Sequence, residues 1–99
     1  MKYKIRAAAK RDLDEAAVWY REHSVDPRVA LRFLLEVSAV FDMIAETPRA
    51  FQEVHRDIRR CRVLASPAYS VFYRVLTDVV VITAVFHGHR RPQGWKRRR

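Results

Sequence analysis

Apolar and polar residues change their spacing within the first part of the chain. They alternate over residues 2–8, a period of two that predicts a short half-buried strand with apolar side chains at Tyr3, Ile5 and Ala7. From about Arg11 the spacing becomes helical, with apolar residues at Leu13, Ala16, Ala17 and Tyr20. The predicted first turn carries acidic residues, which suit the positive end of a helix dipole: Asp12, Asp14 and Glu15. We expect this helix to end within residues 23–26.

A second helix is predicted to follow at once. Pro27 suits the first turn of a helix, and Asp26 suits the position that caps it. The apolar residues form two adjacent stripes, of which the first is expected to face the core and contains Phe33, Leu34, Val37, Val40, Phe41 and Ile44. The second stripe contains Leu31, Leu35 and Ala39. It indicates either a helix sunk deeply between the first helix and a sheet, or a groove for a partner's helix.

Three strands are predicted after a polar connection over residues 49–57. The ranges 58–65, 69–76 and 79–87 are rich in β-branched and aromatic residues. The connections between them are too short for crossovers, so the three strands should form an antiparallel meander. The predicted fold class is therefore α+β, with an N-terminal strand, a helical hairpin and a three-stranded antiparallel meander packed on the helices.

A two-residue turn at Thr77 and Asp78 sorts the last two strands into two faces. It places three pairs of residues opposite one another: Leu76 with Val79, Arg74 with Val81, and Phe72 with Thr83. The face toward the helices then carries Tyr69, Val71, Tyr73, Val75, Val80, Ile82, Ala84 and Phe86. The other face is more polar and carries Ser70, Phe72, Arg74, Thr83 and His87. We expect any functional surface of the sheet on this second face.

The length of 99 residues accommodates one domain, which we expect over residues 1–95 with a basic tail at 96–99. The chain from Gly94 onward is expected to be free. The longest apolar run, residues 79–86, is far shorter than the roughly 20 residues of a membrane-spanning helix. The basic start of the chain lacks the apolar stretch of a signal peptide. The sequence therefore predicts a cytoplasmic protein without a membrane partner, and Cys61 is expected to be a small buried residue.

The net charge of +9 arises in the second half of the chain. Residues 1–48 contain eight Lys or Arg and eight Asp or Glu, whereas residues 49–99 contain twelve Lys or Arg and three acidic residues. Such a field attracts polyanions, for example nucleic acid or an acidic protein. A solvated basic surface accounts for the charge equally well, so charge alone does not select a function.

Five local patterns follow one another in the order of a known family. They are Asp12-Leu13, Pro27-x-x-Ala30-x-x-Phe33-Leu34, Thr47-Pro48-Arg49, Tyr69-Ser70-Val71-Phe72-Tyr73-Arg74-Val75 and Val85-Phe86-His87-Gly88-His89-Arg90-Arg91-Pro92. With the order of the elements, they resemble the ParE/RelE superfamily of type II toxin–antitoxin toxins, and its ParE-like, plasmid stabilisation type in particular. The resemblance covers nearly the whole chain.

The resemblance implies a toxin that a small acidic antitoxin, encoded by the adjacent gene, holds inactive. ParE-like members inhibit DNA gyrase and need no hydrolytic site. RelE-like members cut messenger RNA on the ribosome, and that reaction requires a base, an acid and a cation beside the phosphate. No cofactor is expected.

The chain departs from the nuclease pattern at two positions. Ser70 stands where RelE-like members have an arginine, and Gly88 where some have another arginine or an aromatic residue. His87 matches a catalytic histidine of some nucleases, and a cation could come from Arg60, Arg62 or Arg74. The catalytic candidates are His87, Arg62 and Arg74. The incomplete set favours a ParE-like inhibitor of DNA gyrase. The alternatives are a ribosome-dependent mRNA endoribonuclease, which would be an enzyme, a non-toxic basic nucleic-acid-binding domain and a degenerate toxin.

Further residues are candidates for binding. Contacts with the target are expected at Arg90, Arg91 and Trp95. Contacts with the antitoxin are expected at Leu31, Leu35, Arg60 and Arg62. Trp95 among basic residues is typical of a nucleic-acid patch or of a side chain folded back over the sheet. His87 and His89 lack a third residue at the spacing of a metal ligand, so no metal site is expected. Trp19 and Tyr20 are expected to pack between the helices.

Overall fold

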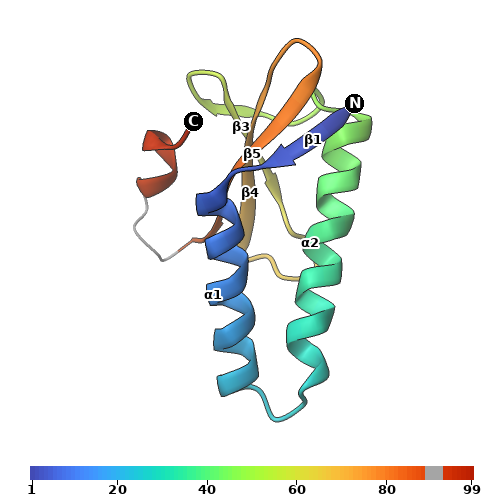
Figure 1. The fold of residues 1–99 in the computed structure, drawn as a ribbon, viewed down its shortest axis with the longest axis vertical. Helices are drawn as coiled ribbons and strands as arrows, with labels where there is room; N and C mark the ends of the chain where they lie inside the picture. The colour runs from blue at the N-terminus through green and yellow to red at the C-terminus, as the bar shows by residue number, and fades with distance from the viewer. Residues whose placement is uncertain (89–92) are drawn as a thin grey trace.

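Five strands form one mixed sheet, and two long helices cover one of its faces (Figure 1). The computed structural model describes residues 1–88 and 93–99. The elements are β1 (Lys2–Ile5), α1 (Ala7–His23), α2 (Arg28–Glu46), β2 (Glu53–His55), β3 (Ile58–Arg62), β4 (Tyr69–Val75), β5 (Val79–His87) and the 3-10 helix η1 (Gly94–Arg97). The sheet has the order β1-β5-β4-β3-β2, in which β1 runs parallel to β5 and the other neighbours are antiparallel. The predicted α+β class and order of elements are confirmed.

Helix α1 begins at Ala7 and not near Arg11 as the spacing predicted. Alanine has the highest helix propensity of any residue type, and three consecutive alanines stand at the start of α1. The helix therefore extends back to the end of β1. The prediction that acidic residues occupy the first turn is therefore wrong. Asp12 lies further into the helix and its side chain is 2% exposed.

The two neighbouring aromatic residues of α1 have different environments. Tyr20 packs on Phe33 of α2, with ring centroids 5.1 Å apart, as predicted. Trp19 is exposed and stacks on His23 of its own helix at 4.4 Å, so its predicted place between the helices is wrong. One step along a helix turns a side chain by about 100°, and only one of two consecutive residues can point at the same neighbour.

Helix α2 has the predicted start and the predicted buried stripe. Asp26 Oδ1 accepts the backbone N–H of Arg28 at 2.9 Å, which confirms its capping role. The residues of the first stripe that are buried are Phe33, Val37, Val40, Phe41 and Ile44. In the second stripe, Leu31 is 59% and Leu35 is 62% exposed. The alternative of a deeply sunk helix is therefore wrong, and an apolar stripe remains on the outer side of α2.

The polar residues 49–57 contain a short edge strand that the sequence did not indicate. Strand β2 pairs with β3 through Glu53 opposite Arg59 and His55 opposite Ile58. Arg56, in the turn between them, has a φ of 53°, the left-handed conformation that a tight reversal requires. An edge strand needs few apolar residues, so the polar composition of residues 49–57 gave no indication of β2.

A β-bulge between β4 and β5 decides which side chains face the helices. The predicted register holds from the turn as far as Tyr73 opposite Ile82. Beyond this pair, Phe72 lies opposite Ala84, so Thr83 is the extra residue at the irregularity. Thr83 is fully buried, and its hydroxyl donates to the Phe72 carbonyl at 3.2 Å. One extra residue in β5 moves each later side chain to the other face. The predicted faces are therefore wrong for Ala84, Phe86 and His87.

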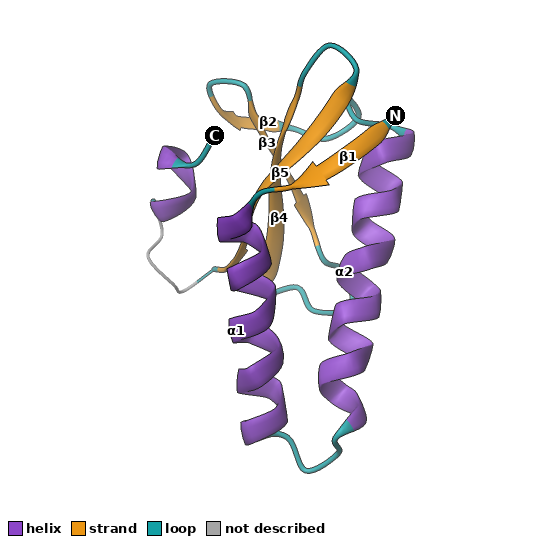
Figure 2. Ribbon diagram, in the orientation of Figure 1, coloured by secondary structure: helices purple, strands orange, loops and turns teal. Residues whose placement is uncertain are grey.

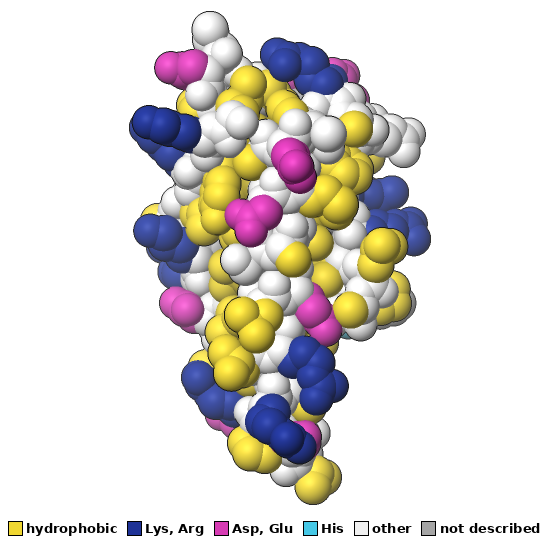
Figure 3. All heavy atoms as spheres, turned by 90° about the vertical axis from the view of Figure 1, so that its right-hand side faces the viewer, with side chains coloured by type: hydrophobic (Ala, Val, Ile, Leu, Met, Phe, Trp, Pro, Cys, Tyr) yellow, Lys and Arg dark blue, Asp and Glu magenta, His cyan; other side chains and the backbone are white. Residues whose placement is uncertain are grey.

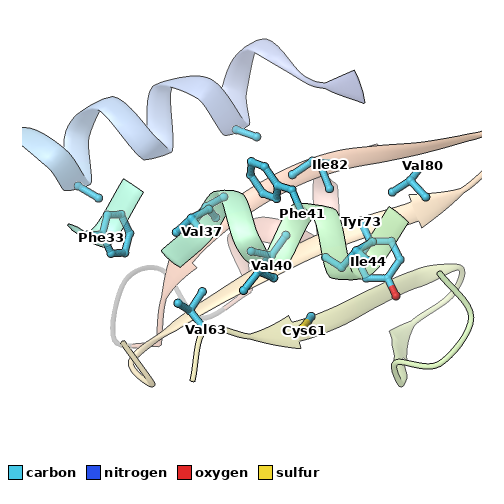
Figure 4. Packing of buried hydrophobic residues seen from close by; sticks show 14 residues of the cluster. Phe33, Val37, Val40, Phe41, Ile44, Cys61, Val63, Tyr73, Val80 and Ile82 are labelled. Atoms are coloured by element: carbon cyan, nitrogen blue, oxygen red, sulfur yellow. The ribbon is translucent and has the colours of Figure 1, made fainter. Parts of the chain in front are cut away.

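The main core lies between the helices and the inner face of the sheet, the face turned toward α1 and α2 (Figure 4). The sheet and the residue after β3 contribute Cys61, Val63, Val71, Tyr73, Val80, Ile82 and Val85. Burial raises the pKa of the Cys61 thiol, which agrees with a packing residue and not a reactive one. The Tyr73 hydroxyl donates to the Pro48 carbonyl at 2.7 Å, and burial raises the pKa of Tyr73 to about 12.

A second apolar cluster covers the outer face of the sheet, the face turned away from α1 and α2. It contains Ile58, Phe72, Ala84 and Phe86, and Val54 and Trp95 pack against it. Trp95 belongs to η1, which lies on the side of α1 remote from α2 (Figure 2). The residues from Gly94 onward thus return to the fold instead of extending as the free tail that we expected, because Trp95 buries its ring there and Arg98 pairs with Asp12. No helix within residues 1–88 and 93–99 has the length and apolar character needed to cross a membrane.

Candidate functional site

The outer face of the sheet carries a cavity of about 170 Å³ where β4 begins and β5 ends. We call it the outer-face cavity. Its walls are Arg60, Ser70, Phe72, Phe86, His87, Gly88 and Trp95. It brings together three residues that the sequence singled out for different roles: Arg60, His87 and Trp95.

Trp95 forms one wall of the outer-face cavity. Its indole stacks on the Phe72 ring with centroids 4.2 Å apart and an angle of 12° between the planes. His55 approaches the indole edge-on at 6.2 Å, and the Lys96 ammonium lies 5.8 Å from its centroid. One face of the indole is therefore already covered by protein, and Trp95 is in the first place a packing residue with a basic neighbour.

The two arginines among the catalytic candidates lie far apart on the outer face. Arg74 Nε donates to Asp57 Oδ2 at 3.0 Å, and Arg74 Nη1 donates to the Arg99 carbonyl at 3.1 Å. Arg62 is exposed on β3, opposite Ser70. Ser70 and Arg74 are four residues apart on β4, which corresponds to roughly 13 Å along the strand. Arg74 is therefore held near Asp57 at one end of β4, and Arg62 lies opposite the other end.

The third catalytic candidate, His87, lies at the end of β5 between two cavities. The bulge turns its ring toward Tyr69, which it meets edge-on with centroids 5.1 Å apart. His87 contributes to the outer-face cavity and also to a cavity of about 250 Å³ whose other walls are Asp12, Glu15, Ala16, Trp19 and Tyr69. Its position is compatible with a proton donor at the rim of either cavity.

Asp12 is the residue of this region that the sequence analysis placed in the wrong environment. Its carboxylate accepts the backbone N–H of Val85 at 2.9 Å and forms two contacts with the Arg98 guanidinium. Arg98 lies over the Phe86 ring, 4.7 Å from its centroid. Helix α1, β5 and the C-terminal residues are thus joined at one carboxylate. The available signal was its spacing, because Asp12 lies on the buried stripe of α1, three residues after Ala9.

A third cavity, of about 370 Å³, lies between α2 and the β3–β4 loop. We call it the α2–loop cavity. Its walls are Tyr20, Val29, Arg32, Phe33, Glu36 and the loop residues 65–68. The Ser66 hydroxyl donates to the Glu36 carboxylate at 2.9 Å and ties the loop to the helix. Leu64, in the same loop, is exposed.

The four candidate antitoxin contacts lie on two sides of the molecule. Leu31 and Leu35 are on the outer side of α2, whereas Arg60 and Arg62 lie opposite Phe72 and Ser70 on the outer face of the sheet. The predicted target contacts Arg90 and Arg91 lie outside the described residues, as does His89.

No group of three His, Cys, Asp or Glu side chains that could hold a metal ion occurs in the part of the chain that the structure describes.

Comparisons with known proteins give consistent matches. Residues 3–92 match the family model described as the ParE toxin of type II toxin–antitoxin systems, parDE. A relative named Toxin RelE1, from Caulobacter vibrioides, is 32% identical over 85 residues, which cover 85% of this chain and 89% of the relative. A solved structure of the chromosomal ParDE toxin–antitoxin system from P. aeruginosa has a TM-score of 0.73 at 18% identity, over 88% of this chain and 95% of that chain. The structural likeness shows the same fold.

Proposed function

Because this chain belongs to the ParE toxin family of type II toxin–antitoxin systems, we propose that it arrests growth by inhibiting DNA gyrase in the cytoplasm. As the toxin of a ParDE system it has a cognate antitoxin as its partner. The proposal therefore concerns the target. Its support comes from the arrangement of the candidate catalytic groups.

Cleavage of RNA through its 2′-hydroxyl needs a base, an acid and a cation within hydrogen-bond reach of one phosphate. Here Arg74 already donates to Asp57 and to the Arg99 carbonyl, and Arg62 stands at a distant point of the sheet. If neither Arg62 nor Arg74 supplies the cation, a nuclease loses several kcal/mol of transition-state stabilisation, which is orders of magnitude in rate, unless Arg60 takes that role. The separation of the two arginines is the observation that carries the proposal, because gyrase inhibition requires a docking surface and no hydrolytic site.

We assign the contacts with gyrase to the basic C-terminal part of the chain, at Arg90, Arg91 and Trp95. Within the described residues, Lys96 lies over the Trp95 ring and Arg97 is exposed, so positive charge borders the aromatic side chain. A basic surface of this kind suits an acidic protein surface or the DNA that gyrase holds.

We assign the antitoxin to a path that begins at Leu31 and Leu35. From there it crosses the α2–loop cavity, passes the exposed Leu64 and reaches Arg62 and Arg60 at the sheet. An acidic, extended chain suits this path because it can cover separate sites while its carboxylates pair with the two arginines. Calorimetry with the neighbour-encoded protein tests it: we expect nanomolar affinity for the native chain and a loss of at least tenfold for Leu31→Ala with Leu35→Ala.

One observation favours the second candidate, a ribosome-dependent mRNA endoribonuclease. The outer-face cavity combines Arg60, Ser70 and His87, so Arg60 would supply the cation and His87 the acid. The name of the relative Toxin RelE1 points the same way. In this alternative both Arg60→Ala and His87→Ala abolish toxicity.

Pulse labelling after induction separates the two targets. For a gyrase inhibitor, incorporation of thymidine falls before incorporation of amino acids, and His87→Ala changes toxicity little. Purified gyrase incubated with plasmid DNA and the toxin should accumulate cleaved DNA. An immediate collapse of amino-acid incorporation, together with normal growth of cells that express His87→Ala, would instead identify a nuclease.

A further inference from the structure

The outer side of α2 is an exposed face that no other element of the described chain covers (Figure 1). It runs along the full length of the 19-residue helix. Figure 3 views the molecule from this side: basic side chains gather toward the lower end of the face, acidic ones lie above them, and hydrophobic side chains lie between.

The charged residues on this face are arranged in the reverse of the order that the helix dipole favours. Arg28 and Arg32 are exposed near the N-terminal end of α2, and Asp42 and Glu46 are exposed near its C-terminal end. The helix has no acidic residue in its first turn and no basic residue in its last. A helix dipole favours the opposite arrangement, with acidic residues near the N-terminal end and basic residues near the C-terminal end. The stability of α2 by itself therefore does not account for these charges.

The face is complementary to itself when two copies of α2 run antiparallel. A twofold axis at the level of Val37 brings residues at equal distances before and after Val37 to the same height. Arg28 then comes level with the partner's Glu46, and Arg32 with the partner's Asp42. Because the axis acts on both copies, four pairs of opposite charge are formed. Arg28 also pairs with Asp26, but its side chain is 81% exposed and retains an open edge.

The apolar residues of the face follow the same symmetry. Leu31 comes level with the partner's Met43, and Leu35 with the partner's Ala39. These four residues are exposed in the single copy. An antiparallel pair also sets the N-terminal end of each helix beside the C-terminal end of the other, so the two dipoles attract.

We propose that the free toxin self-associates through this face, with α2 of one copy antiparallel to α2 of a second copy. A second copy is the occupant that matches both ends of the face, because an acidic partner helix meets repulsion at Asp42 and Glu46, and a basic one at Arg28 and Arg32.

The association should be weak and sensitive to salt. A 19-residue helix is about 28 Å long, and one helix pair buries less than the roughly 800 Å² per partner of a stable interface. We therefore expect a dissociation constant in the micromolar range. The antitoxin path proposed above includes Leu31 and Leu35, so a bound antitoxin would exclude the second copy. The exclusion of the second copy by the antitoxin rests on the proposed function, whereas self-association does not.

Charge reversal tests the proposal on the full chain. Arg28→Glu with Arg32→Glu makes the face wholly acidic, and Asp42→Arg with Glu46→Arg makes it wholly basic. Each change moves charge toward the sign that the helix dipole favours, so both variants should fold. In sedimentation equilibrium we expect the native chain to dimerise, each variant to remain monomeric, and an equimolar mixture of the two to form a heterodimer.

A cysteine variant provides a second measurement. Ser38 lies next to the proposed axis, and two copies of Ser38→Cys should form a disulfide under mild oxidation. Glu22→Cys, on the exposed side of α1, is the matched control: it should still dimerise but should form no disulfide between copies. The proposal is overturned if the native chain remains monomeric at hundreds of micromolar. It is also overturned if both charge-reversed variants still dimerise, or if the acidic antitoxin is needed to bring two toxin copies together.

Discussion

Arg98 and Asp12 are 86 residues apart in the sequence, yet Arg98 Nη2 lies 3.1 Å from Asp12 Oδ1. The same carboxylate accepts the backbone N–H of Val85, so it holds the C-terminal residues and β5 against α1. The two residues after η1 and the first turns of α1 are thereby one structural unit.

Arg98→Ala should lower the free energy of unfolding by about 2–3 kcal/mol. It leaves the Asp12 carboxylate buried without its cation, and an unpaired buried charge is strongly destabilising, although Arg98 itself is partly exposed. Urea denaturation measures the effect. Arg97→Ala, at an exposed neighbouring position, is the control and should stay within about 0.5 kcal/mol of the native chain. Equal small losses in the two variants would show that the ion pair contributes little.

Thr83→Val should lower stability by about 1–2 kcal/mol. Valine has nearly the same shape, but it removes the hydroxyl that donates to the Phe72 carbonyl at the bulge and leaves that oxygen with one partner fewer. Thr77→Val makes the same change in the exposed β4–β5 turn and should be nearly neutral. Thermal unfolding of both variants measures the difference. A stable Thr83→Val variant would mean that the hydroxyl does not hold the bulge.

Trp95→Ala should lower stability by about 2–3 kcal/mol, whereas Trp95→Phe should lower it by less than half of that. Phenylalanine keeps a ring stacked on Phe72, and alanine leaves a void over the outer cluster. The pair of variants separates packing from target contact. If Trp95 contacts gyrase through its indole, Trp95→Phe reduces toxicity while the fold persists. Unchanged toxicity of Trp95→Phe would show that the indole has a packing role and no role in binding the target.

Asp57→Asn should flatten the dependence of stability on acidic pH. Burial raises the pKa of Asp57, but hydrogen bonds from Arg74 and Arg99 outweigh it and hold the pKa below its ordinary value of 3.8. The folded state therefore binds protons less readily than the unfolded state. The stabilisation is present above the unfolded pKa and is lost as the pH falls through the lower folded pKa.

Urea denaturation between about pH 6 and pH 3 measures this dependence for both chains. The native chain should be the more stable at neutral pH, and the difference should shrink as the pH falls. Parallel curves for the two chains would show that Asp57 does not contribute to the acid transition.

The sequence by itself determined the elements whose evidence is local. The core stripe of α2 and the bounds of β5 follow from the spacing and type of neighbouring residues, and Asp26 caps α2 through a contact two residues away. The order of these elements, with the motifs along them, was sufficient to predict the family. In each case the decisive interactions join residues close together in the chain, so the pattern of the chain contains them.

Tertiary structure decided what depends on distant parts of the chain. The bulge at Thr83 exists where β4 and β5 pair, and it alone determines that His87 faces Tyr69 while Phe86 joins the outer face. The place of Arg98 depends on Asp12, at the far end of the sequence. A one-residue shift reverses the two faces of a strand without altering the alternation of its residues, and an ion pair across 86 positions leaves no periodic signal, so neither could be predicted before the strands and helices met.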